Sequence, residues 1–136
     1  MQGYEDGWTL IGTPKQKEVA DYDIEYDEDF NVVSRTKTGT HTETVYVYES
    51  NGKTKEVTDS ARYKALGNSI ALPFWKVLAR RISAQYDRDI TMGSLFDGIG
   101  GFPLAFEHCG GKAVWASEVE EFCIAVTKER FPEHGD

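Results

Sequence analysis

A glycine-rich turn between a buried strand and a helix is the feature that most constrains the fold of this chain. The stretch reads SLFDGIGG over residues 94–101. The residues before it, about 90–96, are typical of a strand, and a helix is expected over about 102–108, until Gly110-Gly111 ends it. Glycines remove Cβ atoms where a chain turns sharply after a strand, so that a ligand can approach the backbone. The turn is therefore a candidate ligand site.

A second strand and a second helix continue this pattern. The stretch KAVWAS over residues 112–117 indicates a buried strand, and a helix is expected from Glu120 to about Arg130, before Pro132. The order strand, glycine turn, helix, strand, acidic residue, helix is that of half a nucleotide-binding unit. The predicted fold class is α/β, with a partial Rossmann-like fold and an N-terminal segment that contains a β-hairpin.

The acidic residue after the second strand suggests which ligand the turn binds. Glu118 follows Gly98 by 20 residues, where a carboxylate accepts hydrogen bonds from the two ribose hydroxyls of an adenosine. Pro103 interrupts the Gly-x-Gly-x-x-Gly spacing, so a pyrophosphate-containing dinucleotide fits less well. S-adenosylmethionine, an adenosine compound without phosphates, is the predicted cofactor. The alternative is a glycine turn with a purely structural role.

The N-terminal half carries simpler signals. Two β-prone runs around Asn51-Gly52 predict a hairpin over residues 44–57, because these two residues tolerate positive φ angles. Acidic residues at 21–29 alternate with apolar ones, which suits an exposed edge strand or an ordered loop, and a solvated acidic face fits better than a metal site. Apolar residues spaced by three or four predict a helix over about 70–86, with Pro73 in or near its first turn.

Composition and charge narrow the functional classes. The formal net charge is −8, and only residues 61–91 are basic, with six Lys or Arg against two Asp or Glu. Phosphate contacts by Lys and Arg supply most of the non-specific affinity for DNA, so this chain alone is expected to bind DNA poorly. Cys109 and Cys123 have no metal-like spacing and are expected to be reduced core thiols. No metal site is predicted. No apolar run could span a bilayer and no secretion signal is recognised, so a cytoplasmic protein is expected.

Two longer stretches resemble one enzyme family. GSLFDGIGGFPLAFEHCGGKAVWASEVEEFC resembles the opening motifs of the DNA cytosine-5 methyltransferases, of restriction-modification or phage type, and DSARYKALGNSIALP resembles their last motif. MQGYEDGWTLIG resembles the segment after their target-recognition domain. The similarity covers residues 1–12 and 59–136. The last motif precedes the first here, so the resemblance implies a circularly permuted chain, with a recognition-region tail in 1–60 and the cofactor-binding half in 61–136.

The resemblance implies a set of S-adenosylmethionine-binding residues. They are Phe96, Asp97, Gly98, Ile99, Gly100, Gly101, Glu118, Val119, Asn68, Ser69 and Asp136. Glu118 corresponds to the ribose-binding carboxylate, Val119 to the residue that packs on adenine, and Asp136 to the acid near the adenine amino group. Asn68 and Ser69 correspond to the pair near the methionine carboxylate, although both are also good caps for the helix that follows.

The family's catalytic motifs do not occur in this sequence. The resemblance implies a nucleophile in a Pro-Cys motif, a general acid in Glu-Asn-Val and an arginine in Arg-x-Arg, and none of these is found. No catalytic residue is therefore assigned, and this chain alone is expected to be inactive. The expected partners are DNA, reached only with the missing parts, and a complementary methyltransferase chain or a second copy. A subunit of a split enzyme and a non-catalytic interaction module remain alternatives.

Overall fold

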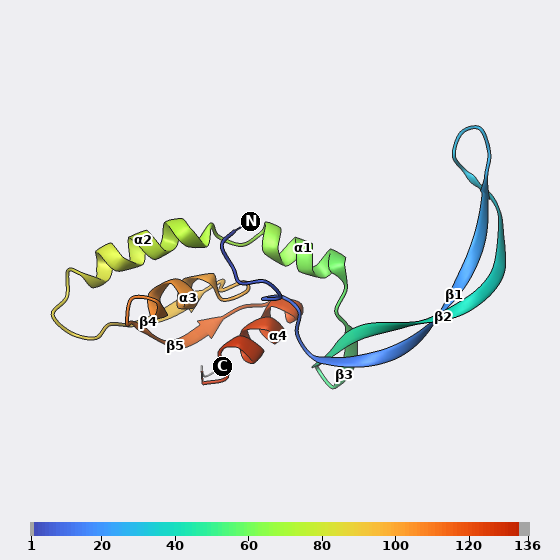
Figure 1. Ribbon diagram of the computed structural model, residues 1–136. Coiled ribbons are helices and arrows are strands. Elements are labelled where there is room, and N and C mark those ends of the chain that lie inside the picture. The colour runs from blue at the N-terminus through green and yellow to red at the C-terminus, as the bar shows by residue number, and fades with distance from the viewer. Residues whose placement is uncertain (1, 134–136) are drawn as a thin grey trace.

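The computed structural model describes residues 2–133 and has a body with one long projecting arm. Its elements are β1 (Thr13–Tyr26), β2 (Val32–Ser50), β3 (Lys53–Glu56), α1 (Asp59–Gly67), α2 (Leu72–Ser83), β4 (Thr91–Leu95), α3 (Gly101–Glu107), β5 (Lys112–Ser117) and α4 (Glu121–Arg130). The first three strands form an antiparallel sheet, and β4 pairs with β5 in parallel. Figure 1 shows the helices and the parallel sheet gathered in the body. The α/β class is thus confirmed.

The N-terminal half forms two consecutive hairpins. The predicted one joins β2 to β3 at Asn51 and Gly52, whose φ angles of 50° and 70° suit a tight hairpin turn. The other pairs β1 with β2 over the whole length of β1. The sequence predicted a strand or loop at the acidic cluster, and β1 is that strand. The extension of β2 back to Val32 was not predicted, because its polar run, rich in threonine, lacks an apolar alternation.

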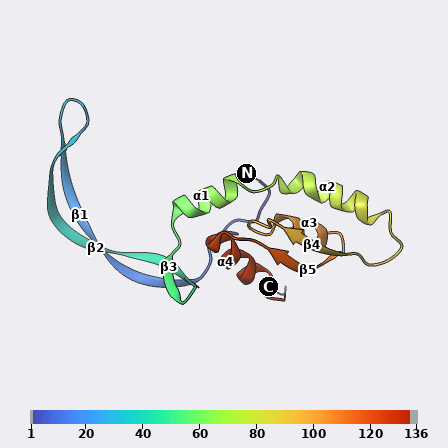
Figure 2. The same ribbon diagram turned by 180° about the vertical axis from the view of Figure 1, so that it is seen from behind.

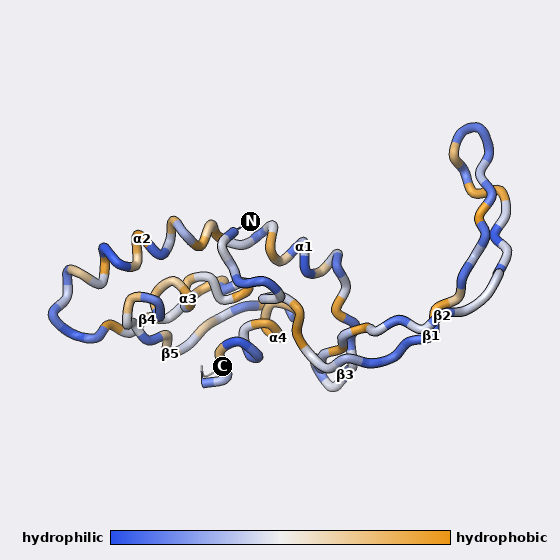
Figure 3. The backbone as a smooth tube through the Cα atoms, viewed as in Figure 1, coloured by the Kyte–Doolittle hydropathy of each residue, from blue (hydrophilic) through white to orange (hydrophobic). Residues whose placement is uncertain are grey.

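The far part of the first hairpin, residues 18–42, projects from the body and is called the arm. Figures 1 and 2 show it extended clear of the helices in both views. Hydrophobic and hydrophilic residues alternate along it (Figure 3). Tyr26 and Phe30 are 56% and 85% exposed, and the Arg35 guanidinium lies 3.9 Å from the centroid of the Tyr22 ring. Cross-strand pairs of this kind stabilise the arm.

His41 of β2 makes hydrogen bonds through both of its ring nitrogens, one across to β1 and one to a residue of its own strand. Nδ1 lies 2.7 Å from Asp21 Oδ1, and Nε2 lies 2.8 Å from Glu43 Oε1. These hydrogen bonds, first that to Glu43 and then that to Asp21, raise the pKa of His41 above its ordinary value. Both contacts need the imidazolium form, in which each nitrogen donates.

A pH effect on the arm follows from the raised pKa of His41. The stabilisation is expected to be complete below the pKa of an unfolded histidine, about 6.5, and to disappear as the pH rises through the higher folded pKa. NMR titration of the His41 ring should show this raised midpoint. Glu43→Gln should lower it, while Glu28→Gln, at the exposed turn of the arm, should not. An ordinary midpoint in the unaltered protein would contradict the contacts of His41 with Glu43 and Asp21.

The base of the hairpins is attached to α4. The Lys55 ammonium pairs with the Glu121 carboxylate, which also accepts a hydrogen bond from the Asn51 side chain at 2.7 Å. The Tyr48 and Phe122 rings meet edge to face, with centroids 5.7 Å apart. The hairpins are thereby fixed to the body at this end, whereas the arm is not.

Helix α1 was not predicted, and helix α2 was. Thr58 begins α1 by accepting a hydrogen bond from the Ala61 N–H at 3.2 Å. The helix has little amphipathic pattern and buries only Ala65, which explains why no periodic signal predicted it. Helix α2 starts at Leu72 and places Pro73 in its first turn, as expected. It ends at Ser83, three residues before the predicted end.

The second half folds as β4, the glycine turn, α3, β5 and α4, in the predicted order and close to the predicted bounds. Among the described residues, β5 is the sole strand that pairs with β4, so the other edge of β4 carries no strand. Leu95 at the end of β4 and Trp115 in β5 are 62% and 44% exposed. One face of this small sheet is covered by α3, which packs in turn on α2.

The main core joins the N-terminal segment to the glycine turn and α4. Its buried members are Trp8, Ile11, Ala65, Ile99, Phe122, Cys123, Val126 and Phe131. The Trp8 indole N–H donates to the Ile99 carbonyl oxygen at 2.8 Å, and its ring meets that of Phe131 at a centroid distance of 5.8 Å. Arg130 Nε donates to the Trp8 carbonyl oxygen at 2.9 Å. The segment before β1 therefore holds the glycine turn in place.

No helix within residues 2–133 is long and apolar enough to cross a membrane.

Candidate functional site

The glycine turn lies at the carboxyl end of β4, beside the end of β5. The Asp97 N–H donates to the Ser117 carbonyl oxygen at 3.1 Å, which ties the turn to β5. The Ser94 hydroxyl donates to the Asp97 carboxylate, and both residues are buried. Phe96, by contrast, is 81% exposed and has a φ of 53°, a left-handed conformation that side chains rarely adopt. This strained backbone leaves the Phe96 ring exposed at the end of β4.

The glycines of the turn have different roles. Gly98 has a φ of 58°, and a Cβ added there would meet no atom within 4 Å. A Cβ on Gly100 would overlap the Phe131 ring, and one on Gly101 would overlap Tyr4 and Ile70. Gly98 therefore borders open space, whereas Gly100 and Gly101 are required by packing. The sequence could not separate these roles, because the packing partners come from distant segments.

Glu118 connects the end of β5 to the glycine turn. Its Oε2 accepts from the Gly98 N–H at 2.6 Å, and its Oε1 accepts from the N–H groups of Val119 at 2.7 Å and Glu120 at 3.0 Å. Burial alone would raise the pKa of Glu118, but these three backbone donors together lower it. The group is thus a carboxylate at neutral pH, and a carboxylate has further lone pairs for ligand hydroxyls.

Asn68 and Ser69 lie at the end of α1, facing the same region. Asn68 is the C-terminal cap of α1, and the Ser69 hydroxyl lies 2.6 Å from the Tyr4 hydroxyl. The alternative role as caps for the following helix is wrong, because Ala71 precedes α2 and gives it no side-chain cap. The loop between the two helices explains this difference, since it places two residues between Ser69 and Leu72.

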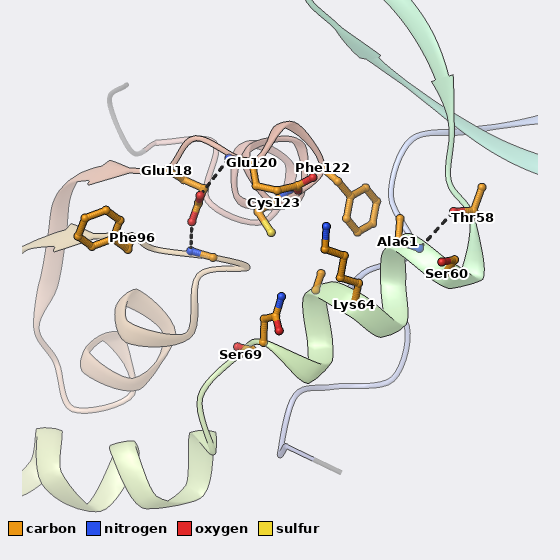
Figure 4. Close-up of a pocket in the computed structure, with 13 residues that line it drawn as sticks. Thr58, Ser60, Ala61, Lys64, Ser69, Phe96, Glu118, Glu120, Phe122 and Cys123 are labelled. Carbon is orange, nitrogen blue, oxygen red and sulfur yellow. Dashed lines mark hydrogen bonds between the residues drawn. The ribbon is translucent and has the colours of Figure 1, made fainter.

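These parts enclose a cavity of about 410 Å³ between α1, the glycine turn and the start of α4 (Figure 4). It is lined by Thr58, Ser60, Ala61, Lys64, Ala65, Asn68, Ser69, Phe96, Gly98, Glu118, Glu120, Phe122 and Cys123. Its size lies within the range of small-molecule sites. Asn68 and Gly98, which are 30 positions apart in the chain, thereby line the same cavity.

The structure brings together some of the predicted site residues and not others. Phe96, Gly98, Glu118, Asn68 and Ser69 line the cavity. Asp97, Ile99, Gly100 and Gly101 are buried and do not line it. Val119 is 84% exposed and is also absent from the lining, and Asp136 lies outside the described residues. The roles predicted for all of these residues stay predictions.

The sequence missed the contributions of α1 and α4 to the cavity. Ala61, Lys64, Ala65 and Asn68 follow the three- and four-residue spacing of one helix face. That spacing was a usable signal, but it had no meaning until α1 was known to be a helix. Glu120 accepts from the Cys123 N–H at 3.0 Å and so begins α4 at the cavity wall.

The described cysteines and acidic residues form neither a nucleophilic site nor a metal site. Burial, followed by the nearby Glu120 carboxylate, raises the pKa of the Cys123 thiol to about 12. A neutral thiol is a weak nucleophile and a poor metal ligand. Cys109 is half-buried and not in a disulfide. Within residues 2–133, no three His, Cys, Asp or Glu side chains form a group that could hold a metal ion.

Comparison with known families gives a match to the last third of the chain. The model of the C-5 cytosine-specific DNA methylase family matches residues 90–136. The matched region contains the parallel sheet, the glycine turn and α4, so the resemblance stated from the motifs is confirmed for this part of the chain. A search of curated proteins finds no match.

Proposed function

We propose that this chain forms the S-adenosylmethionine-binding part of a DNA cytosine-5 methyltransferase whose motifs are circularly permuted. The observation that carries this proposal is the shared cavity. Residues of the ALGNS block, Asn68 and Ser69, line it together with Gly98 and Glu118 of the FDGIGG region. A permuted order would leave such a site intact, because a short connection between the two blocks is sufficient.

The chemistry of the cavity is compatible with S-adenosylmethionine. Glu118 supplies a carboxylate for the ribose hydroxyls, and Gly98 leaves room beside it. Phe96 offers an exposed ring for stacking on a base, and Asn68 and Ser69 offer polar side chains for the amino-acid end. When bound, this cofactor supplies an activated methyl group. The residues of this chain bind and orient it.

Methyl transfer by the isolated chain is expected to be undetectable. Attack on a cytosine ring needs a positioned thiolate, the raised pKa of Cys123 opposes one, and no Pro-Cys motif occurs in the sequence. The test is incubation of DNA with the purified chain and cofactor labelled in its methyl group. Methyl transfer that disappears in Cys109→Ser or Cys123→Ser would contradict the proposal that this chain binds the cofactor but carries no catalytic cysteine.

Within residues 2–133 one edge of β4 pairs with no strand, and this edge favours completion by another chain over an isolated module. A strand edge presents unpaired backbone groups that attract a further strand, and the exposed Leu95 lies beside it. The chain is therefore expected to self-associate or to bind a complementary chain. Light scattering at micromolar concentration should give a mass above that of the 15.3 kDa chain. A stable monomer would show that this edge needs no partner.

The cytoplasmic location of the protein and the division of the chain into two parts at residue 60 also remain proposals.

A further inference from the structure

Lys64 supplies the positive charge of the cavity. Among the described residues that line the cavity, it is the sole cation. It lies four residues before Asn68, so the two side chains occupy the same face of α1 and its end. Figure 4 shows the Lys64 side chain directed from α1 into the space toward α4, where Phe122 and Cys123 lie.

The acidic residues of the cavity are already engaged with the backbone. Glu118 accepts from three N–H groups, and Glu120 accepts from the Cys123 N–H at the start of α4. Within residues 2–133, the Lys64 ammonium makes no hydrogen bond or ion pair, and it acts electrostatically on the neutral Cys123 thiol across the cavity. A solitary ammonium at the wall of a partly enclosed cavity attracts an anion, because the reduced access of water strengthens the charge interaction.

We propose that Lys64 binds the carboxylate at the amino-acid end of the ligand and thereby makes the site selective for adenosyl compounds that carry an amino acid. This inference rests on the proposed cofactor. The ribose end is held at Glu118, and the cavity extends from there to α1, where Asn68 adds an amide to the same wall as Lys64. A charge-assisted hydrogen bond to a carboxylate at this position would contribute to the affinity only for ligands that have this group.

The selectivity is tested with three ligands and four proteins. S-adenosylhomocysteine carries the amino acid, methylthioadenosine lacks it, and adenosine monophosphate carries a different anion. Calorimetry measures their affinities for the unaltered chain and for Lys64→Met, Lys64→Arg and Lys53→Met. Methionine and arginine are good helix formers, so α1 should persist, and circular dichroism verifies this. Lys53 is exposed at the start of β3, away from the cavity, and serves as the matched control.

Lys64→Met is expected to weaken S-adenosylhomocysteine binding about 10-fold and to leave methylthioadenosine binding unchanged. Lys64→Arg should retain most of the preference, and Lys53→Met all of it. An unchanged ratio of the two affinities in Lys64→Met would overturn the role of Lys64 while leaving the cofactor site intact. Tighter binding of adenosine monophosphate than of S-adenosylhomocysteine would assign the cation to a phosphate instead. If neither adenosyl compound binds the unaltered chain, the proposed function itself is wrong, and the role of Lys64 with it.

Discussion

Trp8→Ala is expected to lower the free energy of unfolding by about 3–5 kcal/mol, the cost of removing a large buried aromatic side chain. The Trp8 ring contacts Tyr4 and Phe131, with centroids 5.6 Å and 5.8 Å away, and its N–H satisfies the buried Ile99 carbonyl oxygen. Small domains have a total stability of about 5–15 kcal/mol, so the loss should leave the glycine turn poorly held. The loss in the free energy of unfolding is measured by urea unfolding, with far-ultraviolet circular dichroism as the signal.

Two further variants separate packing from hydrogen bonding at this position. Trp8→Phe keeps an aromatic ring but removes the donor to Ile99, and should cost about 1–3 kcal/mol. Trp115→Ala removes the same residue type from a site that is 44% exposed, so its effect should be clearly smaller than that of Trp8→Ala. Equal losses at Trp8 and Trp115 would show that the N-terminal segment is not part of the core.

Glu118→Ala is expected to weaken binding of S-adenosylhomocysteine by about 1–3 kcal/mol, because the charge-assisted hydrogen bonds to the ribose hydroxyls are lost. The variant also removes the acceptor of the Gly98 N–H, so the turn itself loses a constraint. Calorimetry gives the affinity, and thermal unfolding without ligand gives the structural part of the effect.

Glu28→Ala is the matched control for the charge, since Glu28 lies in the exposed turn of the arm. It should bind the ligand as the unaltered chain does. Glu118→Gln retains one oxygen and should fall between the alanine variant and the unaltered chain. Undiminished affinity in Glu118→Ala would remove this residue from the site.

The elements with a clear periodic or turn signal could be predicted from the sequence. The strands and helices after residue 90, the helix α2 and the turn at Asn51-Gly52 appear in the structure close to the expected bounds. Each has a local cause, such as apolar spacing, a glycine stop or a residue that tolerates positive φ. The family match to residues 90–136 covers the region where these local signals were strongest.

The elements that depend on distant partners could not be predicted. Helix α1 buries only Ala65, and β2 is held by pairing with β1 rather than by an apolar face of its own. The place of Lys64 in the cavity follows from α1 and was missed for the same reason. Gly100 and Gly101 resemble Gly98 in sequence, but their packing against Phe131 and Tyr4 becomes visible only in three dimensions.

The central claim is that the cavity between α1, the glycine turn and α4 binds S-adenosylmethionine or its product. The most direct test is titration of the ¹⁵N-labelled chain with S-adenosylhomocysteine, followed by amide NMR. Saturable shifts are predicted for Asn68, Ser69, Phe96, Gly98 and Glu118, while the arm residues 18–42 stay unchanged. Shift changes confined to other surfaces would contradict this claim. So would the absence of any shift change at millimolar ligand in a chain whose spectrum shows that it is folded.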